Sequence, residues 1–372
     1  MKIGNLPFGI SILLLVSVVS LPPSYGADRP QKPLLGIYYF DGWADSSPAN
    51  FHLQGLTGSY ADREPLSGWY DNSAALVHQQ TVWARKAELN FYIFDWYDTS
   101  RDSNQSDKTL NSALRFFIQD RHKMGMKYSL LYVNNGSFSV PQDKWDAQCK
   151  DWVDTYFKDK NYQRVDGKPL LVTFSVGDMD KTWGSPQNVA QAWERLQQTA
   201  HNAGLPGVYL VACALPGPRN GWNDLNRLVQ EGYDAFSGYN YPGMAGTVKG
   251  SNPYSIILNG SKVIFDDFAT DGRKPYIPDI MTGWDSRPWK ETDYWYERTP
   301  DQFGQMVTEG LDWWRDNPTV RAIQNRPLLF VEAWNELGEG SYIMPTKGDG
   351  FQYLDALKSA VENWVHLNPG AK

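Results

Sequence analysis

The stretch PLLFVEAWNELGEG, residues 327–340, runs from an apolar segment directly into two glutamates. Pro327–Trp334 is short and rich in Leu, Phe and Val, which is typical of a buried β-strand. Glu336 and Glu339 lie just beyond its end. The two carboxylates are therefore expected to leave the sheet together, and the fold around this strand decides what they face.

The rest of the chain repeats a strand followed by a helix. Short β-rich runs alternate with longer amphipathic stretches that often begin at Asp, Ser or Pro and end near Gly or Asn, as capped helices do. The predicted strands are Leu34–Phe40, Asn90–Trp96, Lys127–Val133, Pro169–Phe174, Gly207–Ala212, Asp234–Tyr239, Tyr276–Met281 and Pro327–Trp334. The predicted helices are Ser73–Ala87, Lys108–Met124, Pro141–Phe157, Pro186–Ala203, Trp222–Glu231, Pro253–Thr270, Pro300–Asn317 and Phe351–Leu367.

This alternation predicts parallel strands joined by right-handed crossovers. Eight such units in 372 residues favour an α/β fold, a single (β/α)8 TIM barrel. A doubly wound sheet is the alternative, but no glycine-rich phosphate turn follows the first predicted strand. No linker or change in composition divides the chain, so residues 27–372 are predicted to form one catalytic domain. The long connections at 41–72, 97–107, 213–221, 240–252 and 282–299 would then lie at the C-terminal mouth, where barrel enzymes build their active sites.

Residues 1–26 are predicted to be a cleaved signal peptide. Lys2 supplies a positive charge, Ile10–Val19 is apolar but too short to cross a bilayer, and Ser24 and Gly26 place small residues just before Ala27. We therefore expect a secreted or periplasmic protein. No cysteine stands where a lipid anchor would be attached, and no later apolar run is long enough to span a membrane.

Charge and composition exclude several classes of partner. The net charge is −7 and there is no basic cluster, which argues against nucleic acid or an anionic membrane surface. The 5 His and 2 Cys show no H-x-x-H or C-x-x-C spacing, so no metal site is expected. An exported protein permits a disulfide between Cys149 and Cys213, but two cysteines make no disulfide framework, and their pairing is left open. We expect a monomer.

The chain is unusually rich in aromatic residues, with 16 Trp and 21 Tyr. A large core would account for part of this content. Many of the tryptophans, however, lie in polar, glycine-rich segments. Flat amphipathic rings stack on the apolar faces of sugar rings, so the composition favours a carbohydrate ligand.

Two carboxylates at one cleft are the minimal machinery for cleaving a glycosidic bond, because one donates a proton to the leaving oxygen while the other stays ionised. Apolar walls raise the pKa of one carboxyl, and a polar or cationic neighbour lowers that of the other. Gly338 and Gly340 would let the backbone turn tightly, so that both glutamates point into the same cleft. A solvated or helix-capping glutamate pair is the alternative. The position after a buried strand, beside Trp334 and Asn335, favours a functional pair.

Several segments resemble one known group of proteins. WNELGEG (residues 334–340) resembles the W/F-N-E-W-x-E-G signature of glycoside hydrolase family 99 and of WbsX-like proteins. LLGIYYFDGW, REPLSGWYD, PDIMTGWDSRPW and YLDALKSAV resemble their first strand, a P-x-x-G-x-Y-D segment, their seventh-strand segment and their closing helix. The sequence departs from the pattern at Leu337, where the family has an aromatic residue, and at Gly338, where many family 99 members have His.

The resemblance implies a retaining glycoside hydrolase, similar to endo-α-mannosidases and α-mannanases, without a metal or organic cofactor. Glu336 would be the base toward the sugar 2-hydroxyl, and Glu339 would be the acid/base. The 2-oxygen then displaces the leaving group to form a 1,2-anhydro sugar, which requires the two groups to be trans-diaxial. α-Mannosides and α-rhamnosides meet this condition, whereas α-glucosides do not. The expected substrate is an α-linked manno- or rhamno-configured polysaccharide or oligosaccharide.

Further substrate contacts are expected at the other strand ends, although strand alternation turns about half of these residues outward. Asp95 and the pair of Asp285 with Arg287 are the strongest of these, because a charge at a strand end needs a partner or a ligand. For Asp285 and Arg287, a structural salt bridge is the alternative. The predicted substrate-binding residues are Tyr38, Tyr39, Asp95, Trp96, Asn134, Tyr239, Tyr241, Trp284, Asp285, Arg287, Trp334 and Asn335.

Three other functions stay open at this point. An α-1,3-glucanase of a related barrel family would need a different mechanism. A non-catalytic glycan-binding barrel is opposed by the presence of both glutamates. A glycosyltransferase is opposed by the absence of a nucleotide-binding turn or a D-x-D motif at a strand end, and by a signal peptide that would carry it away from nucleotide sugars. The glycan, its linkage and exo or endo action are not fixed by the sequence.

Overall fold

The computed structural model describes residues 31–43, 51–69, 72–101, 109–215, 225–290 and 293–368, together with Met1. The predicted signal peptide, apart from Met1, lies outside these described residues. The same holds for the first residues of the helices predicted from Lys108 and Trp222.

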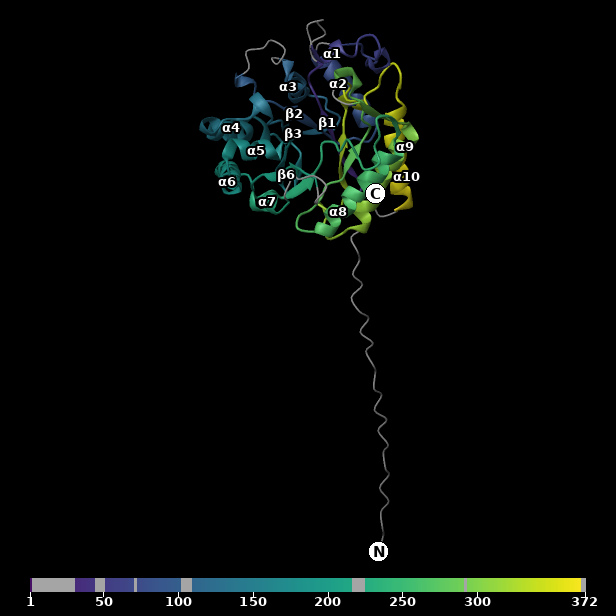
Figure 1. Cartoon of the computed structure of the whole chain (residues 1–372). Helices are drawn as coiled ribbons and strands as arrows, with labels where there is room; N and C mark the ends of the chain where they lie inside the picture. The colour runs from purple at the N-terminus through teal and green to yellow at the C-terminus, as the bar shows by residue number, and fades with distance from the viewer. Residues whose placement is uncertain are drawn as a thin grey trace.

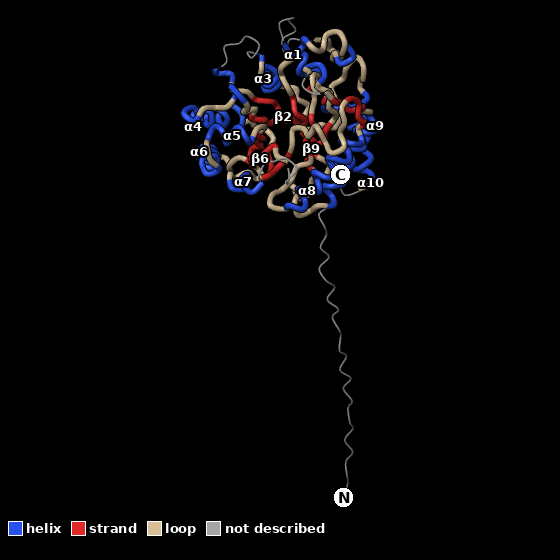
Figure 2. The backbone as a smooth tube through the Cα atoms, in the orientation of Figure 1, coloured by secondary structure: helices blue, strands red, loops and turns tan. Residues whose placement is uncertain are grey.

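Parallel strands form a barrel at the centre of the molecule, and helices surround it (Figures 1 and 2). The barrel strands are β1 (Leu34–Tyr39), β2 (Phe91–Trp96), β3 (Lys127–Tyr132), β5 (Lys168–Thr173), β6 (Tyr209–Cys213), β7 (Ala235–Ser237), β9 (Asp279–Met281) and β11 (Leu328–Glu332). They are hydrogen-bonded in the order β7-β6-β5-β3-β2-β1-β11-β9, and a parallel bridge between Phe236 and Tyr276 joins the two ends. The predicted (β/α)8 barrel is confirmed, and every predicted barrel strand is present.

The helices follow the strands and begin at residues that cap them. Ser73, Ser185 and Thr299 each accept a hydrogen bond from a backbone N–H in the first turn, and in the last two cases Pro follows directly. The helices are α1 (Phe51–Gln54), α2 (Ala74–Lys86), α3 (Ser112–Gln119), α4 (Trp145–Asp151), α5 (Val176–Trp183), α6 (Pro186–Asn202), α7 (Leu225–Gln230), α8 (Ser255–Asp271), α9 (Pro300–Asp316) and α10 (Gln352–Leu367). A π-helical segment, Trp152–Phe157, continues α4 to the predicted end.

In the described part of the chain, three short strand pairings involve residues outside the eight barrel strands. They join β4 (Arg164–Val165) to β5, β8 (Gly250–Pro253) to β10 (Tyr294–Glu297), and β12 (Asn335–Glu336) to β13 (Ser341–Tyr342). The pairing of β8 with β10 connects the long loops that follow β7 and β9, so each of these loops at the mouth is held by the other.

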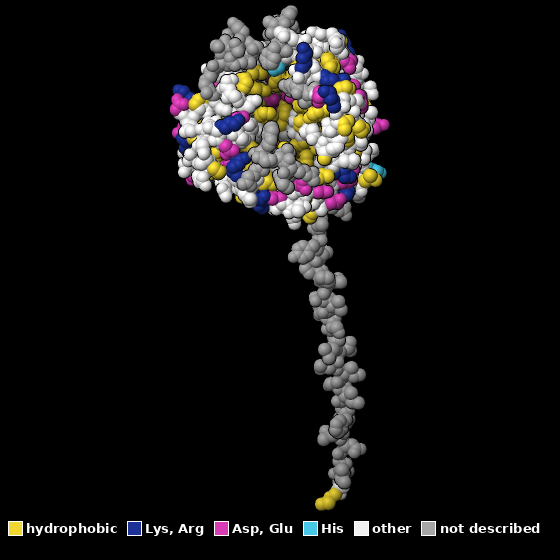
Figure 3. Space-filling view, in the orientation of Figure 1, with side chains coloured by type: hydrophobic (Ala, Val, Ile, Leu, Met, Phe, Trp, Pro, Cys, Tyr) yellow, Lys and Arg dark blue, Asp and Glu magenta, His cyan; other side chains and the backbone are white. Residues whose placement is uncertain are grey.

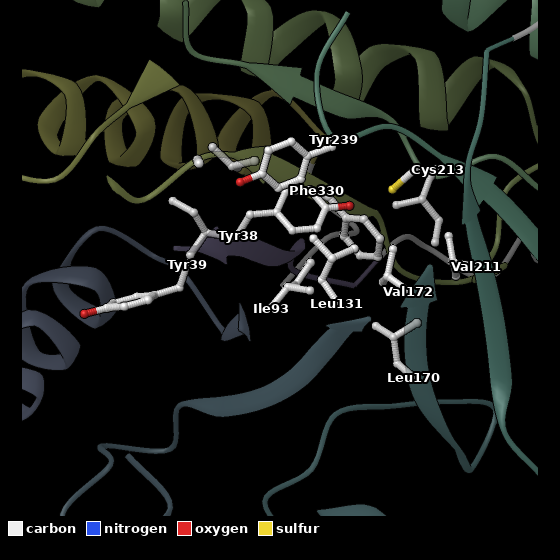
Figure 4. Close-up of a cluster of buried hydrophobic side chains, with 14 of the residues drawn as sticks. Tyr38, Tyr39, Ile93, Leu131, Leu170, Val172, Val211, Cys213, Tyr239 and Phe330 are labelled. Atoms are coloured by element: carbon white, nitrogen blue, oxygen red, sulfur yellow. The ribbon is translucent and has the colours of Figure 1, made fainter. Parts of the chain in front are cut away.

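The barrel interior is filled by side chains from alternate strand positions, as a barrel of this size requires. Figure 4 shows Tyr38 of β1 in this cluster, packed against Tyr239 and Phe330, while the neighbouring Tyr39 points away. The cluster also contains Ile93, Leu131, Leu170, Val172, Val211 and Cys213. Strand parity therefore determines which residues beyond the strand ends face the barrel axis.

Cys149 and Cys213 are both buried and carry free thiols in the structure. Among the described residues, no helix is long and apolar enough to cross a membrane.

Candidate active site

The two signature glutamates lie on a small hairpin that follows β11. Glu336 belongs to β12, and Glu339 lies in the turn before β13. Gly340 has a φ of +68°, a left-handed conformation that favours glycine. Gly338 lacks such a φ, but a Cβ at this position would lie 2.1 Å from the ring of Trp289. Gly338 lies in the same turn, but it is required there because it leaves room for an indole ring and not because of a left-handed backbone.

Both glutamates line one cavity of about 230 Å³ at the C-terminal mouth of the barrel. Two other predicted site residues, Asp95 and Tyr239, line it with them. The remaining lining residues are Phe40, His52, Tyr97, Leu110, Val133, Asn135, Phe138, Phe174 and Trp289. Figure 3 shows hydrophobic side chains gathered around a hollow near the middle of the face in view. A larger hollow of about 790 Å³, between α9 and α10, contains none of the predicted site residues.

The hydroxyl of Tyr239 lies between two buried carboxyl groups. It donates a hydrogen bond to Glu336 Oε1 at 2.5 Å and lies 3.3 Å from Asp95 Oδ2. Asp95 is 4 % exposed and Glu336 is 5 % exposed. Glu339 is only partly buried, and its Oε2 accepts a hydrogen bond from Asn240 Nδ2 at 3.1 Å. The two glutamates thus differ in both depth and partners.

Burial dominates the electrostatics of this region. It raises the pKa of Asp95 well above the usual range, and the charge of Glu336 raises it further. Asp279 on β9 and Glu332 on β11 also have strongly raised pKa values, caused first by burial and, for Glu332, then by the neighbouring Glu339. No hydrogen bond to the side-chain oxygens of Asp279 or Glu332 is present among the described residues. Burial therefore disfavours the ionised form of all three carboxyl groups.

Asp285 and Arg287 do not line the cavity but belong to a clamp behind the hairpin. Asp285 forms ion pairs with Arg287, at 2.7 Å, and with Arg63. Arg63 also donates to the backbone carbonyl oxygens of Leu337 (2.8 Å) and Asp285 (3.1 Å), and the Asp285 N–H donates to Glu339 O. The structural salt bridge thus describes this pair, and it fixes the loop between the two glutamates.

Asn335 and Asn134 are also buried in structural roles. Asn335 exchanges two hydrogen bonds with the backbone of Phe40, at 2.9 and 2.6 Å, so it positions a cavity residue at the end of β1. Asn134 makes the equivalent pair of bonds to the backbone of Ser175 after β5. Each asparagine ties together the ends of two neighbouring connections at the mouth.

Three predicted aromatic residues face the outer helices instead of the cavity. Tyr39 and Trp334 both donate to Gln80 Oε1 on α2, and Trp96 packs edge-on against Trp152. Tyr39 and Trp96 have the strand parity opposite to that of the neighbouring cavity residues Phe40 and Asp95, whereas Trp334 lies beyond the end of β11 and does not follow the strand alternation. The structure therefore does not bring these three side chains to the glutamates.

The last three predicted contacts are also buried and absent from the cavity lining. Tyr38 donates to Gly238 O at 2.9 Å and lies beneath Tyr239, in the interior of the barrel. The Tyr241 hydroxyl donates to Ala214 O at 3.3 Å. Trp284 is 6 % exposed and does not reach the cavity.

Strand parity identifies several lining residues that the sequence prediction missed. Phe40, Val133 and Phe174 each lie two positions beyond an inward residue, namely Tyr38, Leu131 and Val172. His52, Phe138 and Trp289 come from connections without periodicity, so no simple sequence signal marks them. Leu110 falls in the helix predicted from Lys108, but the structure begins α3 only at Ser112.

Among the described residues, no three His, Cys, Asp or Glu side chains are grouped so as to hold a metal ion. The arrangement offers proton donors and acceptors within an aromatic wall, which is the equipment of acid–base chemistry on a flat, partly apolar ligand.

Residues 137–357 match the model of the family described as glycosyltransferase WbsX. The chain belongs to the WbsX family. The family resemblance is therefore confirmed, and the match includes the signature at residues 334–340. A search of curated proteins finds no match.

Two solved structures are similar in fold to this WbsX-family chain. A GH99 endo-alpha-mannosidase from Bacteroides thetaiotaomicron is 17 % identical over 91 % of this chain and 98 % of that chain, with a TM-score of 0.61. A glycoside hydrolase-like protein is 16 % identical over 92 % of this chain and 97 % of that chain, with a TM-score of 0.63. At this identity, the likeness establishes the shared barrel fold.

Proposed function

We propose that this protein is a retaining glycoside hydrolase that cleaves α-linked manno- or rhamno-configured glycans through a 1,2-anhydro sugar. The observation that carries the proposal is that Glu336 and Glu339 line one aromatic-walled cavity and have different partners there. The fold shared with an endo-alpha-mannosidase adds support.

The different surroundings of the two glutamates fit the two roles. Glu336 is nearly fully buried and accepts a hydrogen bond from Tyr239, and such a bond favours the ionised form that a base requires. Glu339 is nearer to solvent, where a leaving group exits. In the proposed first step, Glu336 removes the 2-hydroxyl proton while the 2-oxygen attacks the anomeric carbon, and Glu339 protonates the departing oxygen. Glu339 then activates the water that opens the anhydro ring.

The cavity favours hydrolysis over transfer from a nucleotide sugar, despite the family's description. Asp95, Glu336 and Glu339 line it, and no Lys or Arg occurs among the described lining residues. A nucleotide diphosphate needs cationic side chains, a metal ion or a helix N-terminus for its phosphates. An acidic, aromatic cavity suits a neutral sugar ring.

Export is part of the proposal and has its own test. The sequence of residues 1–26 supports cleavage before Ala27, so the mature enzyme would start near that residue and act outside the cytoplasm. N-terminal sequencing of the protein from the exported fraction of its source cell should give a start near Ala27. An intact Met1 would contradict export by cleavage.

The activity itself is tested by incubating purified protein with α-mannans, α-rhamnans and α-glucans and measuring product sizes. We expect cleavage of the first or second class only. Glu339→Gln should slow hydrolysis of natural glycan by about 10²–10⁴-fold, the usual effect of general acid catalysis, and should partly spare an activated aryl glycoside. Glu336→Gln should lose both activities, because activation of the leaving group does not replace the base.

The matched control is Glu362→Gln, which changes a surface glutamate on α10 and should leave both activities intact. A wild-type enzyme that cleaves only α-glucans, or a 2-fluoro sugar that traps an ester on either glutamate, would refute the anhydro mechanism.

A further inference from the structure

Asp95, Tyr239 and Glu336 form a chain of contacts from three different elements. Asp95 lies on β2, Tyr239 follows β7, and Glu336 belongs to β12. The Tyr239 hydroxyl is 2.5 Å from Glu336 Oε1 and 3.3 Å from Asp95 Oδ2. The other Asp95 oxygen, Oδ1, is buried and has no hydrogen-bond partner among the described residues.

Counting protons determines the direction of these contacts. A phenol has one proton and donates one hydrogen bond, whereas an ionised carboxylate only accepts. The shorter contact indicates that the Tyr239 hydroxyl keeps its proton and donates it to Glu336 in a hydrogen bond. The contact with Asp95 then directs a phenolic lone pair at a carboxyl oxygen, which is attractive only if Asp95 carries the proton and donates it.

The surroundings of Asp95 favour a protonated side chain. Burial and the charge of Glu336 raise its pKa, and this outweighs the opposite effect of the hydroxyl groups of Tyr239 and Tyr97. No described Lys or Arg forms an ion pair with Asp95. The titratable groups that act electrostatically on Asp95 or Tyr239 are Asp41 from the end of β1, Tyr97 after β2, Glu332 on β11, and Glu336 and Glu339 on the hairpin. All are acids, so none of them stabilises a negative charge on Asp95 by Coulomb attraction.

We propose that Asp95 is a neutral carboxylic acid that acts through Tyr239: it donates to the Tyr239 oxygen, and this keeps the phenolic O–H directed at Glu336, which stays ionised. Asp95 is then a positioning residue for the base. The inference rests on the role proposed for Glu336 as the base, but the protonation of Asp95 is a property of the resting protein and does not require activity.

Two substitutions separate this role from that of an anion. Asparagine has the shape of aspartic acid and offers an N–H donor to the Tyr239 oxygen in place of the O–H donor. Asp95→Asn should therefore retain the wild-type arrangement. Leucine has similar bulk and no donor. In Asp95→Leu the acidic limb of the kcat/KM profile should rise by about one pH unit, since one hydrogen bond in the chain is lost. At pH values below that limb, the activity should fall by about tenfold.

The kinetic test measures kcat/KM from pH 4 to 8 for the wild type and both variants, on the glycan that the wild type cleaves. The proposal expects the acidic limb of Asp95→Asn to stay within about 0.3 pH unit of the wild type, well inside the shift expected for leucine. An Asp95→Asn enzyme as impaired as Asp95→Leu would show that a negative charge at this position is required. An unshifted limb in Asp95→Leu would show that Asp95 does not act through Tyr239. Either result overturns the proposal.

Infrared difference spectroscopy tests the protonation state without substrate. Subtracting the Asp95→Asn spectrum from the wild-type spectrum at pH 7 should reveal the C=O stretch of a protonated carboxylic acid. A carboxylate band instead would refute the inference. A wild-type protein that cleaves no α-manno- or α-rhamno-glycan would refute the proposed function, while the infrared band would still decide the state of Asp95.

Discussion

Replacing Gly338 by alanine should displace Trp289 from the cavity wall. A Cβ at position 338 would lie 2.1, 2.2 and 2.6 Å from three atoms of the indole ring. Non-bonded carbon atoms settle about 3.5–4.0 Å apart, so the ring must retreat by more than about 1 Å. The backbone of Gly338 is not left-handed, so alanine introduces no strain other than this overlap.

The displacement has two measurable consequences. Trp289 stacks on Trp43 with centroids 6.1 Å apart at 26°, and its Nε1 donates to His52 O at 3.4 Å. Overpacking of this kind destabilises a protein by about 1–3 kcal/mol. Because the ring also lines the cavity, a misplacement of about 1 Å should lower kcat/KM by up to about 10²-fold.

The assay combines urea unfolding, kcat/KM on the cleaved glycan, and near-ultraviolet circular dichroism, in which the stacked Trp43 and Trp289 contribute a signal. The matched control is Gly177→Ala in α5, where an added Cβ meets no atom within 4 Å and φ is not left-handed. The control should keep full activity and gain about 0.5–1 kcal/mol of stability. If Gly338→Ala keeps the wild-type dichroism and activity, then Trp289 is not held against this glycine and the argument fails.

Three further outcomes are expected. Burial lowers the pKa of His52 to about 4, so the stability linked to this residue is complete above pH 6.5 and falls by up to about 3 kcal/mol as the pH drops through 4; urea unfolding at pH 7 and 4 should show a smaller loss in His52→Phe than in the wild type. Arg63→Met breaks the clamp and leaves Asp285 with Arg287 alone, so thermal unfolding should show a loss of about 3–5 kcal/mol and activity should fall with it, whereas an unchanged melting temperature would contradict the clamp. Dialysis against a chelator should leave activity intact, because the proposed chemistry uses carboxylates alone; recovery only on adding a divalent ion would refute this.

The barrel follows from the sequence because its strands and helices differ in period. Apolar runs at the lengths of buried strands, separated by capped amphipathic stretches, admit few arrangements other than parallel strands with crossovers. The short elements were not predicted for a physical reason. Helix α1 has four residues, and β8 and β10 have four each, so they contain about one helical turn or two repeats of the strand alternation, which is too short for a recognisable pattern. Contacts with neighbouring loops, not local propensity, define them.

The candidate site is predictable only where strand geometry carries it. Asp95 lies two residues after the inward-facing Ile93, and the same spacing from Tyr38 leads to Phe40, so counting in twos from the core identifies cavity residues. The same rule turns Tyr39 toward α2. It fails for Trp334, which is four residues after the inward-facing Phe330 but donates to α2, because it lies beyond the end of β11. His52 and Trp289 come from loops, and their places depend on contacts such as that between Trp289 and Gly338, which no local pattern encodes.

The buried acids around the mouth indicate that this end of the barrel serves chemistry at the expense of stability. Asp95, Asp279 and Glu332 are each buried to at least nine-tenths, and no described Lys or Arg forms an ion pair with any of the three. Burying an unpaired charge is costly, so such groups take up protons instead, and neutral acids without hydrogen bonds still destabilise a core. Apolar residues would fill the same positions more favourably. The mutual electrostatic effects among these acids also limit how many of them are ionised at once. If the other acids are neutral, the negative charge lies on Glu336, where the hydrogen bond from Tyr239 stabilises it. The site then has one base at a defined position.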